Sequence, residues 1–297
     1  MKSERPLFSV IIPTYNRAGH LAAALRSVIQ QSFHEFEVIV VDDGSTDGTE
    51  EVVRSFEDVR IRYFRKANEE RSIARNFGID KSLGAYVTFL DSDDFLYEDH
   101  LAVALQMAKD KSNPEVFHLS YEIKSLDGVL RMQMQSKGDI NKRLIYGNFL
   151  SCIGVFVRGD IIKKHRFNTD LDIIGSEDYE LWMRLAARYK IHASSHITAC
   201  LTEHVARSVN AIEKNTVVLR IEKLYQYLLE DDAVRKYYDR YMHVIKSQLY
   251  LYCALHLLEA KFFPEGRSYF FKAFKAYPTC VFSKKGLVLM KKLIFKA

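Results

Sequence analysis

The sequence has few cysteines and no long apolar run. The four cysteines among its 297 residues are scattered, and no two of them have the CxxC spacing of a zinc or redox site. We therefore expect reduced thiols in a cytosolic protein rather than a disulfide framework. Residues 1–6 are polar and the apolar run after them is short, which does not match a secretory signal peptide. The longest apolar helical stretch, residues 249–258, is too short to cross a bilayer.

The overall composition is that of a soluble globular protein, but the charge is unevenly placed. Hydrophobic residues make up 48% of the chain and charged residues 27%. The length allows one large domain with an appendage, or two domains. Of the formal charge of +5, residues 261–297 carry +8, from nine Lys or Arg and the single acid Glu265, so residues 1–260 sum to −3. This asymmetry indicates a separate role for the C-terminal end.

Short apolar runs alternate with segments of helical spacing over the first 121 residues. We predict strands at 8–12, 36–41, 59–64, 85–90 and 115–121, and helices at 21–30, 49–56, 72–83 and 99–110. Repeated strand–helix units imply an α/β fold with a mostly parallel sheet and right-handed crossovers. Residues 122–175 are less regular, and the signal changes to helices after about residue 215. We therefore predict two domains, 1–214 and 215–297.

Acidic clusters follow two of the predicted strands, and a third cluster opens a later helix. They are Asp42-Asp43, the Asp91-Ser92-Asp93-Asp94 segment and Glu177-Asp178. Ligands of open α/β sheets bind beyond the carboxyl ends of the strands. Asp91, Ser92 and Asp93 offer the oxygen ligands that a hard divalent cation prefers. Acids at strand ends together with a metal indicate a site for a phosphorylated nucleotide.

Five motifs in a fixed order resemble those of family 2 glycosyltransferases of the GT-A fold. They are FSVIIPTYNR at 8–17, VVDDGSTD at 40–47, ARNFGI at 74–79, LDSDD at 90–94 and SEDYELW at 176–182. The resemblance covers roughly residues 7–210. It implies an inverting, metal-dependent transfer of a sugar from a nucleoside diphosphate sugar, which we expect to be a UDP-sugar. The implied acceptor is a saccharide or a lipid-linked saccharide of cell-surface polysaccharide synthesis.

The resemblance also assigns residues to the nucleotide. Pro13, Thr14 and Tyr15 would cradle the nucleoside, and Asp43 would bind its base. A turn or helix-cap role is the alternative for the neighbouring acids of this motif, because Asp-Gly-Ser-Thr-Asp is also favourable turn chemistry. The guanidinium group of Arg71 or Arg75 would bind the diphosphate through two parallel N–H hydrogen bonds. For Arg71, a solvated side chain at a helix start is an equal alternative.

The predicted metal site lies in the segment from Asp91 to Asp93. Mn²⁺ or Mg²⁺ bridging two phosphates would neutralise the charge that develops on the leaving nucleoside diphosphate. Asp93 would bind the metal directly, Asp91 would bind the ribose or the metal through water, and Ser92 would line the donor site. His204 resembles the family's late histidine, which completes the metal shell or touches the diphosphate. A surface histidine is the alternative for His204.

The Glu177-Asp178 pair is expected to supply the base. The acceptor hydroxyl must lose a proton as it attacks the anomeric carbon, and a carboxylate within hydrogen-bond reach accepts it. The resemblance gives that role to Asp178, whereas Glu177 would contact donor or acceptor. Acids at a helix N-terminus are also favoured by the helix dipole alone.

The basic end lies outside the resemblance. Lys284, Lys285, Lys291, Lys292 and Lys296 recur at helical spacing, so we predict one basic face that contacts an anionic membrane surface through residues 281–297. A solvated basic cap is the alternative, and the chain lacks a nucleic-acid recognition module. We expect a cytoplasmic protein, with peripheral attachment at the inner face of the cell membrane if this face binds lipid.

Two other functions compete with sugar transfer. A nucleotidyltransferase also uses strand-end Asp residues and Mg²⁺, but it would carry a Gly-rich basic loop after the first strand, where this chain has Pro-Thr-Tyr-Asn-Arg. A non-catalytic scaffold of a polysaccharide assembly complex is the second rival. A scaffold has no need of carboxylates that repel one another.

Overall fold

The computed structural model describes residues 5–125, 127–134, 138–203 and 214–295. The chain packs into two compact units. The first comprises Met1–Ile140, Phe149–Thr169 and Tyr189–His204, and the second comprises Asn141–Asn148, Asp170–Arg188 and Val205–Ala297. Because these units are defined by packing and not by a single cut in the sequence, the predicted division between residues 214 and 215 stays a prediction.

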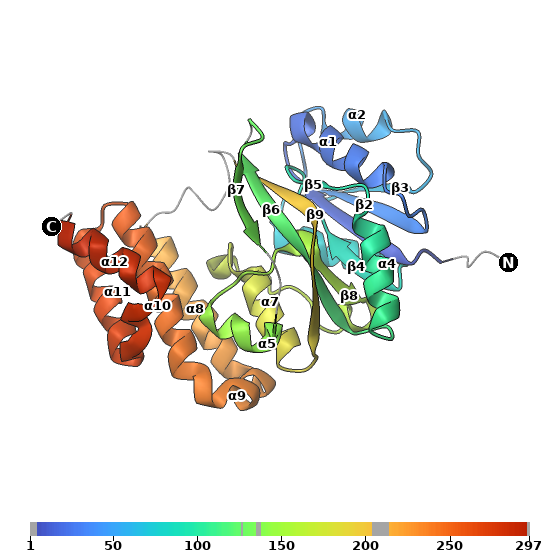
Figure 1. Cartoon of the computed structure of the whole chain (residues 1–297). Coiled ribbons are helices and arrows are strands. Elements are labelled where there is room, and N and C mark those ends of the chain that lie inside the picture. Colours follow the sequence, from blue (N-terminus) through green and yellow to red (C-terminus); the bar gives the residue numbers. More distant parts are fainter. Residues whose placement is uncertain (1–4, 126, 135–137, 204–213, 296–297) are drawn as a thin grey trace. The chain divides into compact units, whose positions relative to one another are not determined.

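The first unit is built on a nine-stranded mixed sheet (Figure 1). Its order is β3-β2-β1-β4-β8-β6-β9-β5, and β7 pairs with β6. The strands β1 to β4 and the β6–β9 pair are parallel, whereas β8, β5 and β7 join antiparallel. The strand bounds are β1 Phe8–Thr14, β2 Phe36–Asp42, β3 Ile61–Arg65, β4 Tyr86–Phe89, β5 Phe95–Leu96, β6 Val116–Ser125, β7 Leu130–Met134, β8 Val155–Arg158 and β9 Ile191–Glu203.

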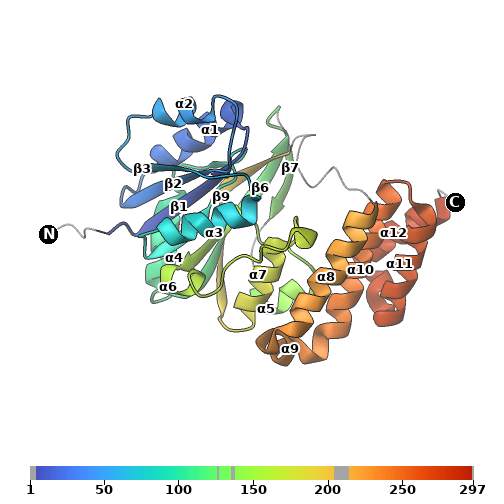
Figure 2. The same cartoon turned by 180° about the vertical axis from the view of Figure 1, so that it is seen from behind.

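Helices cover both faces of this sheet (Figures 1 and 2). Alternate residues of β1 point to opposite faces. Val10 and Ile12 join the buried cluster that contains the apolar residues of α1 (Ala18–Ile29) and α4 (His100–Asp110). Ile11 faces α3 (Arg71–Lys81), so closely that a Cβ on Gly78 would lie 2.5 Å from its Cγ2 atom. The shorter helices of this unit are α2 Thr49–Arg54, α6 Gly159–Ile162 and the 3₁₀ turn η2 Cys152–Gly154.

The five strands and four helices predicted for the first 121 residues are all present, with ends shifted by a few residues. The predicted α/β architecture is therefore confirmed. The strands β5, β7, β8 and β9 were not predicted. β5 has only two residues, and β7 and β8 lie in the irregular region 122–175. β9 is longer, but it shifts its register against β6 twice near Ser120.

The second unit is helical. The helix α10 (Met242–Glu259) lies at its centre and packs against α8 (Lys214–Glu230), α11 (Phe263–Ala276) and α12 (Lys284–Phe295). Helices were predicted after about residue 215, and the structure places α9 (Asp232–Tyr238) between α8 and α10. Among the described residues, no helix combines the length and the apolar character needed to cross a membrane. The remaining elements are α5 Ile140–Arg143, η1 Leu144–Tyr146, η3 Leu171–Ile173, α7 Glu177–Ala186, η4 Asp239–Tyr241 and η5 Pro278–Phe282.

Candidate active site

The first unit brings three predicted segments to one edge of its sheet. Thr14 and Asp42 are the last residues of β1 and β2 and are partners in register. The backbone N–H of Asp43 donates to the carbonyl of Thr14 at 2.8 Å, and that of Leu90 donates to Ile11 at 2.9 Å. The strands β1, β2 and β4 are parallel, so their carboxyl ends meet at the same edge. The segments that begin at Pro13, Asp43 and Asp91 therefore share this edge.

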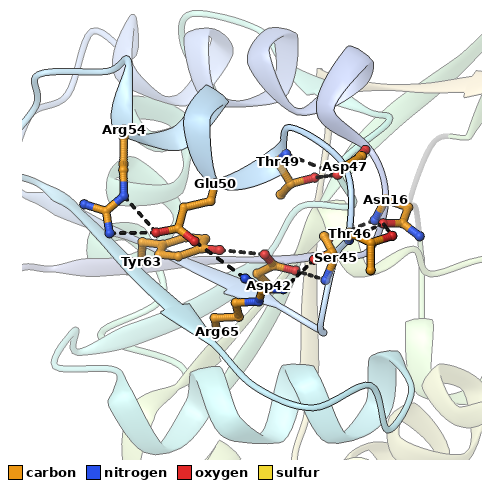
Figure 3. Close-up of polar contacts among 10 residues, drawn as sticks. All are labelled: Asn16, Asp42, Ser45, Thr46, Asp47, Thr49, Glu50, Arg54, Tyr63 and Arg65. Carbon is orange, nitrogen blue, oxygen red and sulfur yellow. Dashed lines mark hydrogen bonds and ion pairs between the residues drawn. The ribbon is translucent and has the colours of Figure 1, made fainter.

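Two acids of the Asp-Asp-Gly-Ser-Thr-Asp motif build the turn itself (Figure 3). Asp42 is buried and accepts from the Ser45 N–H at 2.8 Å and from the Tyr63 hydroxyl at 2.6 Å. Burial and the Asp42 carboxylate raise the pKa of Tyr63 above its ordinary value. Asp47 precedes Gly48, the N-cap of α2, and accepts from the N–H of Thr49, the first helical residue, at 3.1 Å. Hydrogen bonding by Thr49 lowers the pKa of Asp47. These contacts match the turn and cap roles considered for the neighbours of Asp43.

Asp43 has a different environment. It is 4% exposed and accepts from the Lys66 ammonium at 2.6 Å and from the backbone N–H groups of Glu69 and Glu70 at 3.1 and 2.9 Å. Burial acts to lower the pKa of Lys66, but its hydrogen bonds to Asp43 and Glu69 outweigh burial and raise that pKa. Residues 66–70 thus wrap around the carboxylate. A left-handed φ of +88° at Glu70 lets two successive N–H groups point at it.

The turn after β1 is tied to the turn after β2 (Figure 3). The Asn16 side chain accepts from the Thr46 N–H at 2.8 Å, and the Asn16 N–H donates to the Ser45 hydroxyl at 2.9 Å. These bonds hold the Pro13-Thr14-Tyr15 segment beside the Asp43 turn, with Thr14 buried and Tyr15 46% exposed. Asn16 and Ser45 had no predicted role of their own. Their only signal is the preference of Asn and Ser for turns.

Arg75 contacts a predicted metal-site residue. Its guanidinium donates to Asp91 Oδ1 at 2.7 Å and lies 5.3 Å from the ring of Phe167. The side-chain amide of the next residue, Asn76, donates to the carbonyl of Phe167 at 2.9 Å and accepts from the N–H of Phe167 at 3.0 Å. The 2% exposed Arg75 is therefore fixed beside Asp91. Arg71 is the first residue of α3 and is only partly buried.

The four residues after Leu90 alternate in exposure. Asp91 and Asp93 are partly exposed, whereas Ser92 and Asp94 are buried. Asp94 accepts from the Thr202 N–H at 2.8 Å, and its own N–H donates to the carbonyl of Asp91 at 3.1 Å. Asp94 thereby joins the acidic turn to the end of β9. Asp94 had no separate role among the predicted site residues.

The donor set of this turn fits a cation that shares its ligands with phosphates. Within the described ranges, no three His, Cys, Asp or Glu side chains gather as a metal site. Mg²⁺ is commonly held by one or two carboxylates together with substrate phosphates, and Asp91 and Asp93 both reach solvent. The predicted third ligand, His204, lies outside the described residues.

The predicted base lies in the second unit, in the first turn of α7. Asp178 accepts from the Asn148 side-chain amide at 2.9 Å and from the Tyr179 N–H at 2.6 Å. Glu177 is 3% exposed and accepts from the Gly175 N–H at 2.6 Å. Asp178 is less buried than Glu177, and its carboxylate is oriented by two donors. Nothing in the sequence pointed to Asn148.

Comparison with known proteins identifies the family. The family model described as glycosyl transferase family 2 matches residues 9–156. An uncharacterized glycosyltransferase of Haemophilus influenzae is 34% identical over 182 residues, which cover 60% of this chain and 71% of that protein. The chain belongs to glycosyltransferase family 2.

Other relatives of this family 2 glycosyltransferase have more specific names. The GalNAc(5)-diNAcBac-PP-undecaprenol beta-1,3-glucosyltransferase of Campylobacter jejuni is 35% identical over 193 residues, which cover 61% of this chain and 60% of that protein. The chain spans half or less of the length of several relatives, for example 47% of a Rickettsia felis glycosyltransferase and 26% of one from Rickettsia bellii.

Solved structures confirm the predicted GT-A fold. S. aureus TarS 1-349 in complex with UDP-GlcNAc aligns with a TM-score of 0.71 and 23% identity, covering 92% of this chain and 81% of that one. A mannosyltransferase from Pyrobaculum calidifontis in complex with GDP-Man and Mn²⁺ aligns with a TM-score of 0.62 and 18% identity, covering 98% and 86%. At these identities the likeness concerns the fold.

Proposed function

We propose that this family 2 glycosyltransferase moves a sugar, with inversion, from a nucleoside diphosphate sugar to a saccharide or lipid-linked saccharide acceptor. The observation that supports this proposal most directly is the sheet edge where β1, β2 and β4 end, because the segments of Thr14, Asp43 and Asp91 share this edge. We further propose a UDP-sugar donor and a role in cell-surface polysaccharide synthesis. The TarS complex with UDP-GlcNAc and the lipid-linked acceptor in the Campylobacter jejuni name support these choices.

The donor would be held by residues of the first unit. Pro13, Thr14 and Tyr15 would line the nucleoside, and the Asp43 carboxylate would accept a hydrogen bond from the base. Arg75 is already bonded to Asp91. We therefore propose that Arg75 orients this carboxylate, and that Arg71 meets the diphosphate with its planar fork.

The acidic turn would hold a cation with the donor phosphates. Asp93 would bind Mn²⁺ or Mg²⁺ directly, Asp91 would bind it or the ribose through water, and Ser92 would line the donor. His204 would complete the shell. When bound, the cation would neutralise charge on the leaving diphosphate. The Mn²⁺ in the Pyrobaculum calidifontis complex supports this choice of cofactor.

The transfer itself needs one proton acceptor. The acceptor hydroxyl oxygen forms a bond to the anomeric carbon while the bond from that carbon to the phosphate oxygen breaks, and the electron pair leaves with the diphosphate. Asp178 would take the hydroxyl proton. The amide of Asn148 would hold Asp178 in place, and Glu177 would contact donor or acceptor. Attachment of residues 281–297 to an anionic membrane surface would bring the enzyme beside a lipid-linked acceptor.

Calorimetric titration tests the donor half of this proposal. Purified protein is titrated with UDP, GDP, ADP and dTDP, each with Mn²⁺ and with EDTA. We expect metal-dependent binding of UDP, lost in Asp93→Ala and retained in Asp178→Asn. Absence of binding by all four nucleotides to folded protein would contradict sugar transfer and favour the scaffold role. A further titration with UTP tests the other rival, because a preference for UTP over UDP would favour a nucleotidyltransferase.

A further inference from the structure

The outer face of α11 carries apolar and basic side chains without acids. Arg267, Phe271, Phe274 and Lys275 have the spacing of one helical face, and all four are exposed. Phe271 is 65% exposed and Phe274 is 45% exposed. The opposite face, with Tyr269, Phe270 and Ala273, is buried. The exposed phenylalanines thus lie on the side of α11 opposite its buried face.

The following segment repeats this combination. Phe282, at the end of η5, is 77% exposed, and the outer face of α12 presents Lys284, Leu287, Val288 and Lys291. Leu287 and Val288 are 51% and 47% exposed. Both helices, labelled α11 and α12 in Figure 1, therefore have two exposed apolar residues flanked by two exposed cations on one face.

Packing within the second unit engages two of the lysines that were predicted to form one basic face of α12. Lys285 donates to the carbonyl of Tyr146 at 3.3 Å, and Lys292 pairs with Glu259 at 2.9 Å. Burial lowers the pKa of Lys285. Lys296 lies outside the described residues. The exposed cations of α12 are Lys284 and Lys291, and they lie beside apolar residues.

The charge of this surface favours an anionic partner. Arg267, Lys275, Lys284 and Lys291 make no ion pair or hydrogen bond among the described residues, so their charges are available. The only acid in residues 261–297 is Glu265. Clustered exposed apolar residues mark interaction surfaces, and their combination with cations is typical of helices that lie in the interface of an anionic bilayer.

We propose that the outer faces of α11 and α12, with Phe282 between them, dock on an anionic lipid bilayer. The apolar side chains enter the boundary between head groups and acyl chains, and the four cations contact lipid phosphates. This surface extends the predicted membrane contact beyond residues 281–297 and assigns it to named side chains. It does not depend on the proposed sugar transfer, because its test requires neither donor nor acceptor.

Vesicle sedimentation tests the docking surface. The full chain is mixed with phosphatidylcholine vesicles that contain or lack 30% phosphatidylglycerol, at low and at high salt. We expect the protein to bind only the anionic vesicles. High salt should weaken this binding, because dissolved ions screen the attraction between the cations of the protein and the lipid phosphates. Each cation near an anionic surface contributes about fivefold to binding, so Arg267→Gln with Lys275→Gln should weaken it about 25-fold. Phe271→Ser with Phe274→Ser should weaken it at least about tenfold.

Matched variants in the first unit serve as controls. Lys109→Gln with Lys111→Gln removes the same charge from an exposed helix end, and Val59→Ser with Leu83→Ser removes exposed apolar side chains. Both pairs should leave vesicle binding unchanged. If either control pair reduces binding as much as the α11 variants do, the proposed surface is wrong.

Tryptophan emission gives a second readout. The single native tryptophan, Trp182, is fully buried, so it contributes a constant background. Phe271→Trp should shift its emission to the blue when anionic vesicles are added, and Val59→Trp should not. The inference is overturned if the wild-type protein does not bind anionic vesicles. It is also overturned if the α11 variants change self-association or binding to nucleic acid while their vesicle binding equals that of the wild type.

Discussion

Arg75 and Asp91 form a charged hydrogen bond of 2.7 Å just after β4, and Asp91 belongs to the predicted metal site. The two residues come from α3 and from the acidic turn, 16 positions apart in sequence. Phe167 packs against the guanidinium, and Asn76 fixes the backbone of Phe167. The orientation of the Asp91 carboxylate is therefore set by a second layer of contacts that begins on α3.

Replacing Arg75 tests this arrangement. We expect Arg75→Met to weaken Mn²⁺-dependent binding of UDP about 10- to 100-fold, because a hydrogen bond to a charged group is worth roughly 1.5–3 kcal/mol. Arg75→Lys should restore only part of the affinity, since an ammonium lacks the planar fork. Calorimetry measures both. Arg54→Met is the control, because Arg54 forms an exposed pair with Glu50 on α2. Undiminished affinity in Arg75→Met would show that Asp91 needs no support from α3.

The neighbours Asp93 and Asp94 should separate binding from stability. Asp94 is 2% exposed and joins the turn to Thr202, so Asp94→Ala should lower the free energy of unfolding by about 1–3 kcal/mol. Asp93 is partly exposed, and Asp93→Ala should abolish the effect of Mn²⁺ on nucleotide affinity with little change in stability. Urea unfolding and calorimetry on both variants check this. Equal destabilisation by the two substitutions would contradict the division of roles.

Asn148 should act through Asp178. Its amide donates to Asp178 Oδ2 at 2.9 Å, so Asn148→Ala should lower kcat about 10- to 100-fold. Asp178→Asn should lower kcat by about 10²- to 10⁴-fold, the usual contribution of a general base. Affinity for UDP should stay the same in both variants. Gln106→Ala, which removes an exposed amide on α4, is the control. Steady-state kinetics with a saccharide acceptor, together with calorimetry, provide the measurement.

The sequence predicted the first half of the fold and the strand-end acids for the same reason. The strands β1, β2 and β4 are buried on both faces, so they are mostly apolar runs that give way to polar residues. The buried Ser9, Glu37 and Thr88 interrupt them. The roles of Arg75, Asp94 and Asn148 depend on partners that are distant in the chain, and no local pattern encodes such partners.

The remaining strands lacked a local signal as well. The strand β9 has exposed residues in its middle and an irregular register, and β5 has only two residues. The basic face of residues 284–296 was predicted from spacing alone. Packing of the second unit engages Lys285 and Lys292 and leaves Leu287 and Val288 exposed. Spacing defines the faces of a helix, but tertiary packing decides which face remains in solvent.

Acid should destabilise the first unit through a buried histidine. His100 is fully buried between Thr198, whose hydroxyl lies 2.7 Å from Nδ1, and the ring of Phe156. Burial lowers the pKa of His100 to about 3. In the unfolded chain its pKa is about 6.5, so below pH 6.5 the unfolded state binds a proton that the folded state excludes. The stability that the neutral ring contributes is therefore complete above pH 6.5 and is lost progressively as the pH falls towards 3.

The size of this effect can be isolated by substitution. The proton taken up by His100 in the unfolded chain should lower the free energy of unfolding by about 1.4 kcal/mol for each pH unit as the pH falls from 6 to 4. Urea unfolding of the wild type and of His100→Gln over this range measures the difference in slope, in which the contributions of the carboxylates cancel. We expect the slope of His100→Gln to be smaller by about that amount, whereas His192→Gln should reduce it less, because His192 is only partly buried. Identical slopes for His100→Gln and the wild type would mean that His100 is protonated in the folded protein, and its ring would then need an acceptor at Nε2 in addition to Thr198.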